Sequence, residues 1–387
     1  MTPEAGAGRC AIARLRLFQF RNYSAMTVSL GPSLNVIAGD NAQGKTNLLE
    51  AAATLALTRS PRASTSADLV MWGTDGCAVE GAVIRPGGDC TLSLRLERSH
   101  ESDRLSRTTS VDGKPRPARA LLGLCPVVMF WPDDLQLVKA GPDARRRLLD
   151  VLLVQLEPRT AAHMSRYRRV LEQRNALLHR MRAEGRLRPE LDGFTHELVH
   201  HGARLAVARS RLLRELAPRA AAALQELSEG SEHLALEYVA AHGAIGADED
   251  QVEADLLAAL RSRADEELAR GVTVAGPHRD DVSILLGGRS ARTAASQGQQ
   301  RSIVLAIKLA EMRHVAHCTG ALPVVMLDDV LSELDQNRRS QLLALLTAGG
   351  GPQVLVTTTE PLHDVDDVAA TRHFTVVGGT VTEAHES

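Results

Sequence analysis

Four residues, Gly39, Gly44, Lys45 and Thr46, have the types and spacing of a phosphate-binding loop. They fill the pattern G-x-x-x-x-G-K-[ST] within Gly-Asp-Asn-Ala-Gln-Gly-Lys-Thr. Such a loop cradles phosphates with its backbone N–H groups. The groups expected to do so here belong to Gly39, Asp40, Asn41, Ala42, Gln43 and Gly44. Lys45 is expected to reach the β and γ phosphates of a nucleotide, and Thr46 to offer its hydroxyl to Mg²⁺.

The residues around this segment favour a phosphate-binding loop over a chance match on a glycine-rich turn. An apolar run at 34–38 predicts a buried strand, and apolar residues at helical spacing from Leu48 to Leu55 predict a helix after the loop. Among 45 basic residues, Lys stands only at positions 45, 114, 139 and 308, so Lys45 is conspicuous in an Arg-rich chain.

A second motif, which is acidic, lies near the other end of the chain. The apolar run Val324–Leu327 predicts a buried strand that ends in two carboxylates, Asp328 and Asp329. In nucleotide hydrolysis a carboxylate at this place holds Mg²⁺, and a second one polarises the attacking water. Asp328 is therefore the candidate metal ligand and Asp329 the candidate general base. An acidic strand-to-loop turn without chemistry is the alternative.

A possible anion site precedes this strand. Ser296, Gly298 and Gln299 lie at the predicted start of a helix, where a free backbone and the positive helix end favour an anionic group. Ser296 could equally be an ordinary helix N-cap. The order of phosphate loop, insert, S-x-G-Q segment and acidic strand resembles the ATPase heads of the ABC and SMC class. In that class the S-x-G-Q segment completes the ATP site of a partner subunit, which implies an ATP-dependent homodimer.

Length and composition indicate a globular protein of more than one domain. The chain has 387 residues, 44% hydrophobic and 24% charged residues, and a net charge of -2. That charge gives no global sign of nucleic-acid binding, so such a surface must be local. No apolar run reaches the roughly 18 residues of a membrane span, and no signal segment opens the chain. Five scattered cysteines predict a reduced, cytoplasmic protein.

The pattern of predicted elements divides the chain into three stretches. Residues 1–132 predict strands, the loop and its helix, including strands near 78–84, 91–96 and 106–111. Residues 133–270 are rich in Leu, Ala, Arg and Glu and predict helices, with an antiparallel pair over 160–183 and 194–216 and an acidic loop at 242–252. Residues 271–387 return to strands, the first at 272–275. We expect one α/β ATPase head built from both chain ends, with an inserted helical arm domain.

Several motifs together resemble the bacterial RecF family. They are Phe20–Tyr23, Gln43–Glu50, Leu137–Pro142 with Arg146 and Arg147, Gly276–Asp281, Ser296–Arg301 and Leu327–Asp335. The resemblance covers residues 12 to 379. It implies ATP and Mg²⁺ as cofactors, DNA at single-strand gaps as a partner, and action with RecO and RecR to promote RecA loading in recombination, replication and the SOS response. Thr357 to Thr359 stand where many ABC ATPases carry His, which fits slow hydrolysis. No role for His278, Arg279 or Asp280 follows from the residues themselves.

The helical stretch supplies a local concentration of positive charge. Its members are Arg145–Arg147, Arg166, Arg168, Arg169, Arg174, Arg180, Arg182, Arg186 and Arg188. Such a surface suits contacts with DNA phosphates, and an ordinary solvated helix face is the alternative.

Two other functions use the same motifs: an SMC-like chromosome organiser, disfavoured by the short insert, and the ATPase subunit of a transporter. A scaffold with an inactive site is disfavoured by Lys45, Asp328 and Asp329.

Overall fold

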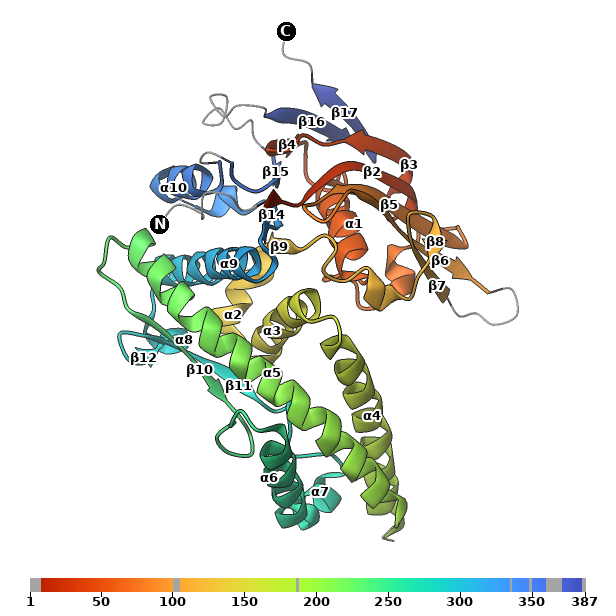
Figure 1. Cartoon of the computed structure of the whole chain (residues 1–387), viewed down its shortest axis with the longest axis vertical. Coiled ribbons are helices and arrows are strands. Elements are labelled where there is room, and N and C mark those ends of the chain that lie inside the picture. Colours follow the sequence, from red (N-terminus) through yellow and green to blue (C-terminus); the bar gives the residue numbers. More distant parts are fainter. Residues whose placement is uncertain are drawn as a thin grey trace. The chain divides into compact units, whose positions relative to one another are not determined.

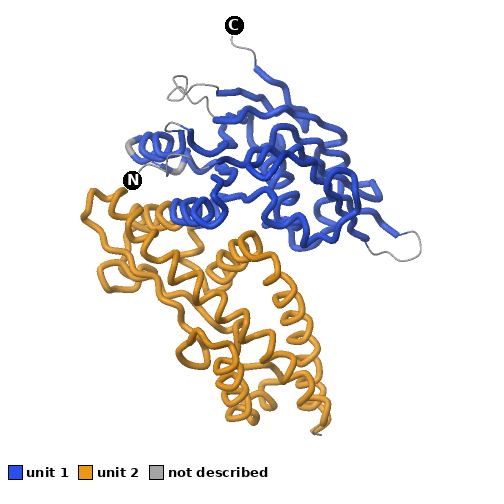
Figure 2. The backbone as a smooth tube through the Cα atoms, in the orientation of Figure 1, with its two compact units in different colours: residues 1–134, 308–387 blue, residues 135–307 orange. Residues whose placement is uncertain are grey.

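The structure of the chain, a computed structural model, describes residues 8–99, 105–185, 188–334, 336–347, 350–359 and 371–384. The chain forms two compact units, residues 1–134 with 308–387 and residues 135–307 (Figure 2). The first unit joins the two ends of the chain, as expected for the head. Arg186 and Asp335, which the sequence motifs include, lie outside the described residues.

The first unit contains a mostly parallel six-stranded sheet with the order β17-β16-β4-β15-β14-β9. Its strands are β4 (Leu34–Ala38), β9 (Val127–Phe130), β14 (Val324–Asp328), β15 (Val354–Thr358), β16 (Arg372–Val377) and β17 (Thr380–Ala384). Strands β4, β15 and β14 are adjacent and parallel, so their carboxyl ends meet at one edge. The phosphate loop after β4 and the acidic pair at the end of β14 therefore share that edge, although they are far apart in sequence.

An antiparallel six-stranded sheet with the order β3-β2-β5-β6-β7-β8 forms the rest of this unit's β structure. Its strands are β2 (Ala11–Phe20), β3 (Tyr23–Ser29), β5 (Gly76–Ile84), β6 (Cys90–Arg98), β7 (Leu105–Val111) and β8 (Lys114–Pro115). Helix α1 (Lys45–Leu57) contacts strands of both sheets (Figure 1). It is buried along nearly all its length. Its Ala- and Leu-rich sequence suits this central place because small and apolar side chains fit on every face.

Smaller elements complete the first unit. They are the pair β1 (Gly8–Arg9) and β13 (Ala321–Leu322), the 3₁₀ turns Ser66–Leu69, Ala118–Ala120, Pro132–Leu135 and Leu331–Glu333, and α10 (Gln336–Thr347). Helix α9 (Gln297–Thr319) begins in the second unit and ends in the first.

The second unit is mainly helical. Its helices are α2 (Gln136–Lys139), α3 (Pro142–Leu156), α4 (Thr160–Glu184), α5 (Glu190–Leu227), α6 (Glu249–Ser262), α7 (Ala264–Arg270) and α8 (Ala291–Ala294). A small antiparallel sheet has the order β10-β11-β12, formed by β10 (Leu234–Val239), β11 (Asp281–Leu286) and β12 (Arg289–Ser290). Helices α4 and α5 pack along each other as the predicted pair.

Several predictions for this unit were wrong in detail. Residues 272–275 form no strand, and β10 was missed because it stands within helix-rich sequence. The predicted acidic loop at 242–252 becomes helix from Glu249, where the side chain of Asp248 accepts a hydrogen bond from the Asp250 N–H. Helix α5 has 38 residues and continues past the predicted end at 216. Residues 271–307 belong to the helical unit rather than to the C-terminal part of the head, because β11 pairs with β10.

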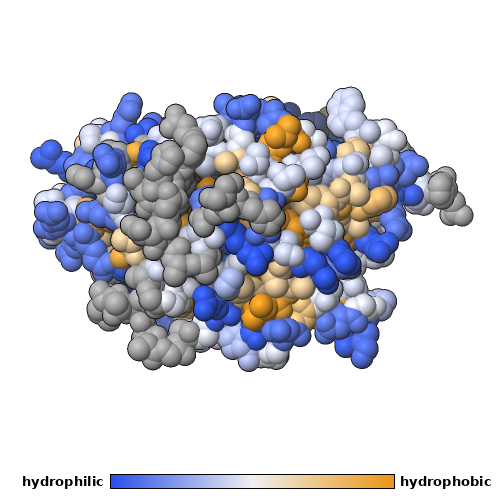
Figure 3. Space-filling model, turned by 90° about the horizontal axis from the view of Figure 1, so that it is seen from above, coloured by the Kyte–Doolittle hydropathy of each residue, from blue (hydrophilic) through white to orange (hydrophobic). Residues whose placement is uncertain are grey.

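Apolar and hydrophilic side chains alternate on the surface. The face in Figure 3 shows small apolar patches between hydrophilic side chains. Large apolar side chains that are exposed come from scattered strands and loops: Phe18, Trp72, Ile84, Val239 and Val377. Within the described part of the chain, no helix has both the length and the hydropathy needed to cross a bilayer.

Candidate nucleotide site

The phosphate loop joins β4 to α1, as the sequence predicted. Its backbone has positive φ at Gly39 (152°) and Gly44 (118°), angles that glycine adopts without strain, and at Ala42 (65°) in the left-handed region. The Lys45 ammonium lies over the loop and donates hydrogen bonds to Gly39 O at 2.6 Å and Asp40 O at 2.8 Å. Asp40, Asn41 and Ala42 are exposed, so the tip of the loop is open to solvent.

Thr46 and Asp328 meet at the carboxyl edge of the parallel sheet. The Thr46 hydroxyl donates to Asp328 Oδ1 at 2.8 Å, and the Thr357 hydroxyl at the end of β15 donates to the same oxygen at 2.8 Å. Burial raises the pKa of Asp328, while these two hydrogen bonds favour its charged form. A hydroxyl and a carboxylate oxygen are the hard ligands that Mg²⁺ prefers.

Asp329 has an unusual backbone and an unsatisfied side chain. Its φ is 53°, in the left-handed region that Asp adopts more readily than most residues. Its N–H donates to Thr357 Oγ1 at 2.9 Å, which fixes the turn after β14. Its Oδ1 atom is buried without a hydrogen-bond partner among the described residues. A buried carboxylate oxygen without a partner is costly, so it is expected to face a water molecule or a ligand.

The turn between β2 and β3 donates hydrogen bonds to the phosphate loop. Asn22 Nδ2 donates to Gln43 O at 2.9 Å, and the buried Tyr23 hydroxyl donates to Gly44 O at 2.9 Å. Arg21 makes two hydrogen bonds, at 2.9 and 2.8 Å, with the carboxylate of Glu50, which is fully buried in α1. The turn thus holds both the loop and the helix that follows it.

These supporting roles were not predicted from the sequence. The sequence predicted a turn at Arg21–Tyr23 between two strands but not its contacts, because the partners of Arg21 and Asn22 lie 29 and 21 residues away. Thr357 had been noted only as standing where many ABC ATPases have His, whereas the structure places its hydroxyl against Asp328 and Asp329. The sequence feature that could have indicated Thr357 was its position at the end of a predicted strand. In the sheet this strand, β15, lies beside β14 and places Thr357 next to Asp328.

The predicted signature residues Ser296, Gly298 and Gln299 lie in the second unit at the start of α9. Ser296 and Gln299 form a reciprocal capping box. The Gln299 N–H donates to Ser296 Oγ at 3.2 Å, and the Ser296 N–H donates to Gln299 Oε1 at 2.8 Å. Ser296 is exposed, so capping and contact with a ligand are compatible.

Comparison with known proteins agrees with the fold and the motifs. The model for the RecF/RecN/SMC N terminal domain matches residues 11–373. The DNA replication and repair protein RecF of Symbiobacterium thermophilum is 41% identical over 96% of this chain and 97% of its own length. The RecF of Listeria welshimeri is 37% identical over 95% of this chain and 98% of its own length. The chain belongs to the RecF family.

Solved structures support the same assignment. A structure of the recombination mediator protein RecF, described as RecF-ATPrS in the RecFOR pathway, has a TM-score of 0.88 and 29% identity, covering 98% of this chain and 100% of that chain. The head domain of Smc from Pyrococcus furiosus has a TM-score of 0.53 at 15% identity, covering 98% of this chain and 96% of that chain, which shows a shared fold alone.

The family motif Gly276–Asp281 forms a hydrogen-bond network inside the second unit. Asp280 is fully buried and accepts hydrogen bonds from the Tyr238 hydroxyl at 2.7 Å and the Ala241 N–H at 2.9 Å. Asp281 forms an ion pair with Arg145, which donates to both carboxylate oxygens. The motif therefore joins β10, β11 and α3, and a structural role accounts for Asp280.

The hydrogen bonds of His278, which belongs to this network, identify its tautomer. Its Nε2 lies 3.1 Å from Thr273 O, which can only accept, so Nε2 carries the proton. Nδ1 then accepts from the Tyr167 hydroxyl at 2.6 Å. Burial lowers the pKa of His278 to about 4, which keeps the imidazole neutral. Arg279 also donates to Thr273 O.

Two arginines predicted for the DNA surface are instead buried ion-pair partners. Arg174, 2% exposed, donates to both carboxylate oxygens of Glu267 and to Thr273 Oγ1. Arg145 is held by Asp281 and by Leu137 O. Including these two residues in the basic surface was wrong, because each is buried and paired with a carboxylate more than 90 positions away in the sequence. The exposed arginines of the described set are Arg147, Arg166, Arg168, Arg169, Arg180 and Arg182.

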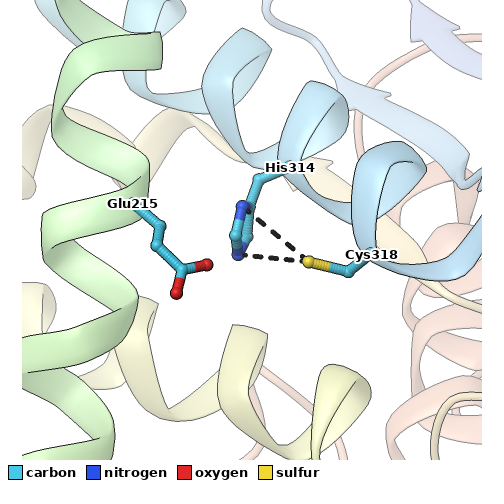
Figure 4. A group of neighbouring side chains, drawn as sticks. All are labelled: Glu215, His314 and Cys318. Carbon is cyan, nitrogen blue, oxygen red and sulfur yellow. Dashed lines mark hydrogen bonds between the residues drawn. The ribbon is translucent and has the colours of Figure 1, made fainter.

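A pair of metal-binding residue types stands one turn apart on α9. Figure 4 shows His314 beside Cys318, whose Sγ lies 3.6 Å from His314 Nε2. Glu215, drawn in the same figure, belongs to the second unit. Two ligands fall short of the four of a structural zinc site, so no metal is assigned to this pair.

Proposed function

We propose that this protein is an ATP-dependent, DNA-binding recombination mediator. In this proposal it acts at single-strand gaps and promotes RecA loading together with RecO and RecR. Membership of the RecF family supports this function, as do similar solved structures, which are named as RecF-ATP in the RecFOR pathway. The single structural observation that carries its ATP-dependent part is the contact between Thr46 and Asp328, with the Lys45 ammonium hydrogen-bonded to the loop beside them.

The residues present fit ATP and Mg²⁺. The loop offers backbone N–H groups from Gly39 to Gly44 for the phosphates, and Lys45 offers an ammonium group. Thr46 and Asp328 would hold Mg²⁺, which when bound neutralises phosphate charge and polarises the γ-phosphate. The buried, unpaired Oδ1 of Asp329 is placed to orient a water molecule and to accept its proton.

Dimerisation is part of the same proposal. Ser296, Gly298 and Gln299 would contact the ATP of a partner subunit, so ATP would join two heads that grip DNA and hydrolysis would release it. Sedimentation velocity with Mg²⁺ and a slowly hydrolysed ATP analogue tests this step. Ser296→Arg should leave ATP binding by the monomer intact and abolish the dimer. A Ser296→Arg protein that still dimerises with the analogue would leave Ser296 as a helix cap alone.

The competing functions make different predictions for the same assays. A recombination mediator should hydrolyse ATP slowly, faster with DNA, and should bind DNA more tightly with Mg²⁺-ATP than without. An SMC-like organiser would need a long coiled coil, whereas α4 and α5 have 25 and 38 residues, or about 38 and 57 Å at 1.5 Å per residue. ATPase activity that DNA leaves unchanged would favour the transporter subunit.

A further inference from the structure

The C-terminal hairpin runs beside the phosphate loop. Strand β16 is the parallel neighbour of β4 (Figure 1). In this pairing Thr375 lies opposite Ala38. The residues that follow these two positions, Val376–Gly379 and Gly39–Gln43, therefore continue side by side past the end of the β4–β16 pairing. The hairpin formed by β16 and β17 turns at Gly378 and Gly379.

This turn donates two backbone hydrogen bonds to one residue of the loop. The Gly378 N–H donates to Gln43 Oε1 at 2.7 Å, and the Gly379 N–H donates to Gln43 O at 3.1 Å. Asn22 Nδ2 donates to the same carbonyl at 2.9 Å. Gln43 is therefore held through its backbone and its side chain, by two turns that lie at opposite ends of the sequence.

Close backbone approach makes glycine necessary at two points of this contact. A Cβ atom at Gly379 would lie 2.4 Å from Asn22 O, and φ there is 77°. A Cβ atom at Gly39 would lie 2.5 Å from Val376 O. Backbone atoms cannot move aside as a flexible side chain can, so any larger residue must push the hairpin, the β2–β3 turn and the loop apart.

We propose that Gly378 and Gly379 are positioning residues for nucleotide binding, acting through Gln43. This inference rests on the proposed function of the loop as an ATP site. The two N–H groups hold the loop in the conformation in which its own N–H groups can meet phosphates, so less ordering is needed when ATP binds. Loosening the turn should weaken ATP binding while the chemical step, which uses Asp328 and Asp329, keeps its rate.

The test compares two glycines that have similar φ angles, 77° at Gly379 and 73° at Gly113, and different surroundings. Gly379→Asn places a side chain against Asn22 O, whereas Gly113→Asn changes a hairpin glycine of the same unit with a φ of 73° and nothing within 4 Å. Asn tolerates the left-handed region, so both variants are expected to fold. Gln43→Met is a second route, because it removes the acceptor of the Gly378 N–H and keeps the side-chain length.

Isothermal titration with Mg²⁺ and a slowly hydrolysed ATP analogue, together with steady-state ATPase kinetics, gives the readout. Gly379→Asn and Gln43→Met should weaken analogue binding by about tenfold and raise KM with kcat within twofold of the wild type. Gly113→Asn should bind like the wild type. Wild-type affinity in both Gly379→Asn and Gln43→Met would overturn the positioning role while leaving the ATP site standing. A wild-type chain that binds no analogue would overturn the proposed function and this inference with it.

Discussion

The Thr46 hydroxyl donates a 2.8 Å hydrogen bond to Asp328 Oδ1 across 282 positions of sequence. This contact joins the helix after the phosphate loop to the carboxyl end of β14. It exists because β15 lies between β4 and β14 in the parallel sheet, so the three strands end at one edge. The proposed metal ligands are thus brought together by the sheet order and not by local sequence.

Asp329→Asn should separate ATP binding from hydrolysis. Thr46 and Asp328 remain to hold the metal, so binding of ATP should persist. Hydrolysis should slow by about 10²-fold, the effect of losing a general base. Asn also accepts the left-handed backbone that Asp329 adopts, so the fold should be unaffected. Single-turnover ATPase assays measure the effect, and normal turnover would assign the role of base to another residue.

Arg21→Met should destabilise the first unit strongly. It leaves the Glu50 carboxylate, which is fully buried, without its main partner, and such a loss costs about 3 kcal/mol. Arg16→Met is the matched control, because the Arg16–Glu80 pair is exposed and worth about 0 to 1 kcal/mol. Urea denaturation measures both. Equal losses in the two variants would show that Glu50 does not depend on Arg21.

The second unit should lose stability as the pH falls from about 6.5 to 4. The unfolded chain protonates His278 near pH 6.5, whereas burial holds the pKa of the folded side chain at about 4. Below pH 6.5 the unfolded state therefore binds more protons, and the free energy of unfolding falls by about 2 to 3 kcal/mol across this window. His278→Gln keeps a donor and an acceptor and should flatten this dependence in urea denaturation series. Identical pH dependence in both proteins would remove His278 as its source.

Charge reversal on α4 tests the remaining basic surface. Changing Arg166, Arg169 and Arg180 to Glu should weaken duplex DNA binding equally for any sequence, because phosphate contacts carry no base information. It should also reduce the salt slope by about 0.9 for each DNA phosphate that the protein no longer neutralises. The control reverses three exposed arginines elsewhere in the unit, Arg214, Arg261 and Arg263. If both variants bind DNA alike, this face of α4 does not hold the DNA.

Local sequence patterns were enough to predict some features of the fold and the candidate site, but not others. Lys45, Thr46 and the strand ending at Asp328 follow from short motifs, because each motif contains its own strand, turn or helix signal. The burial of Arg174 could not be predicted, since Glu267 lies 93 residues away and an Arg on a helix usually faces solvent. The roles of Gln43 and Gly379 depend on strand order in the sheet, which composition and periodicity do not specify.

ATP titration into the wild-type chain and Lys45→Met tests the proposed site most directly. Lys45 carries the ammonium expected to meet the β and γ phosphates, and Met keeps the length of the side chain without the charge. With Mg²⁺ present and both proteins folded by circular dichroism, the wild type should bind ATP and Lys45→Met should lose most of that affinity. Equal ATP affinity in the two proteins would contradict the assignment of residues 39–46 as the nucleotide-binding loop.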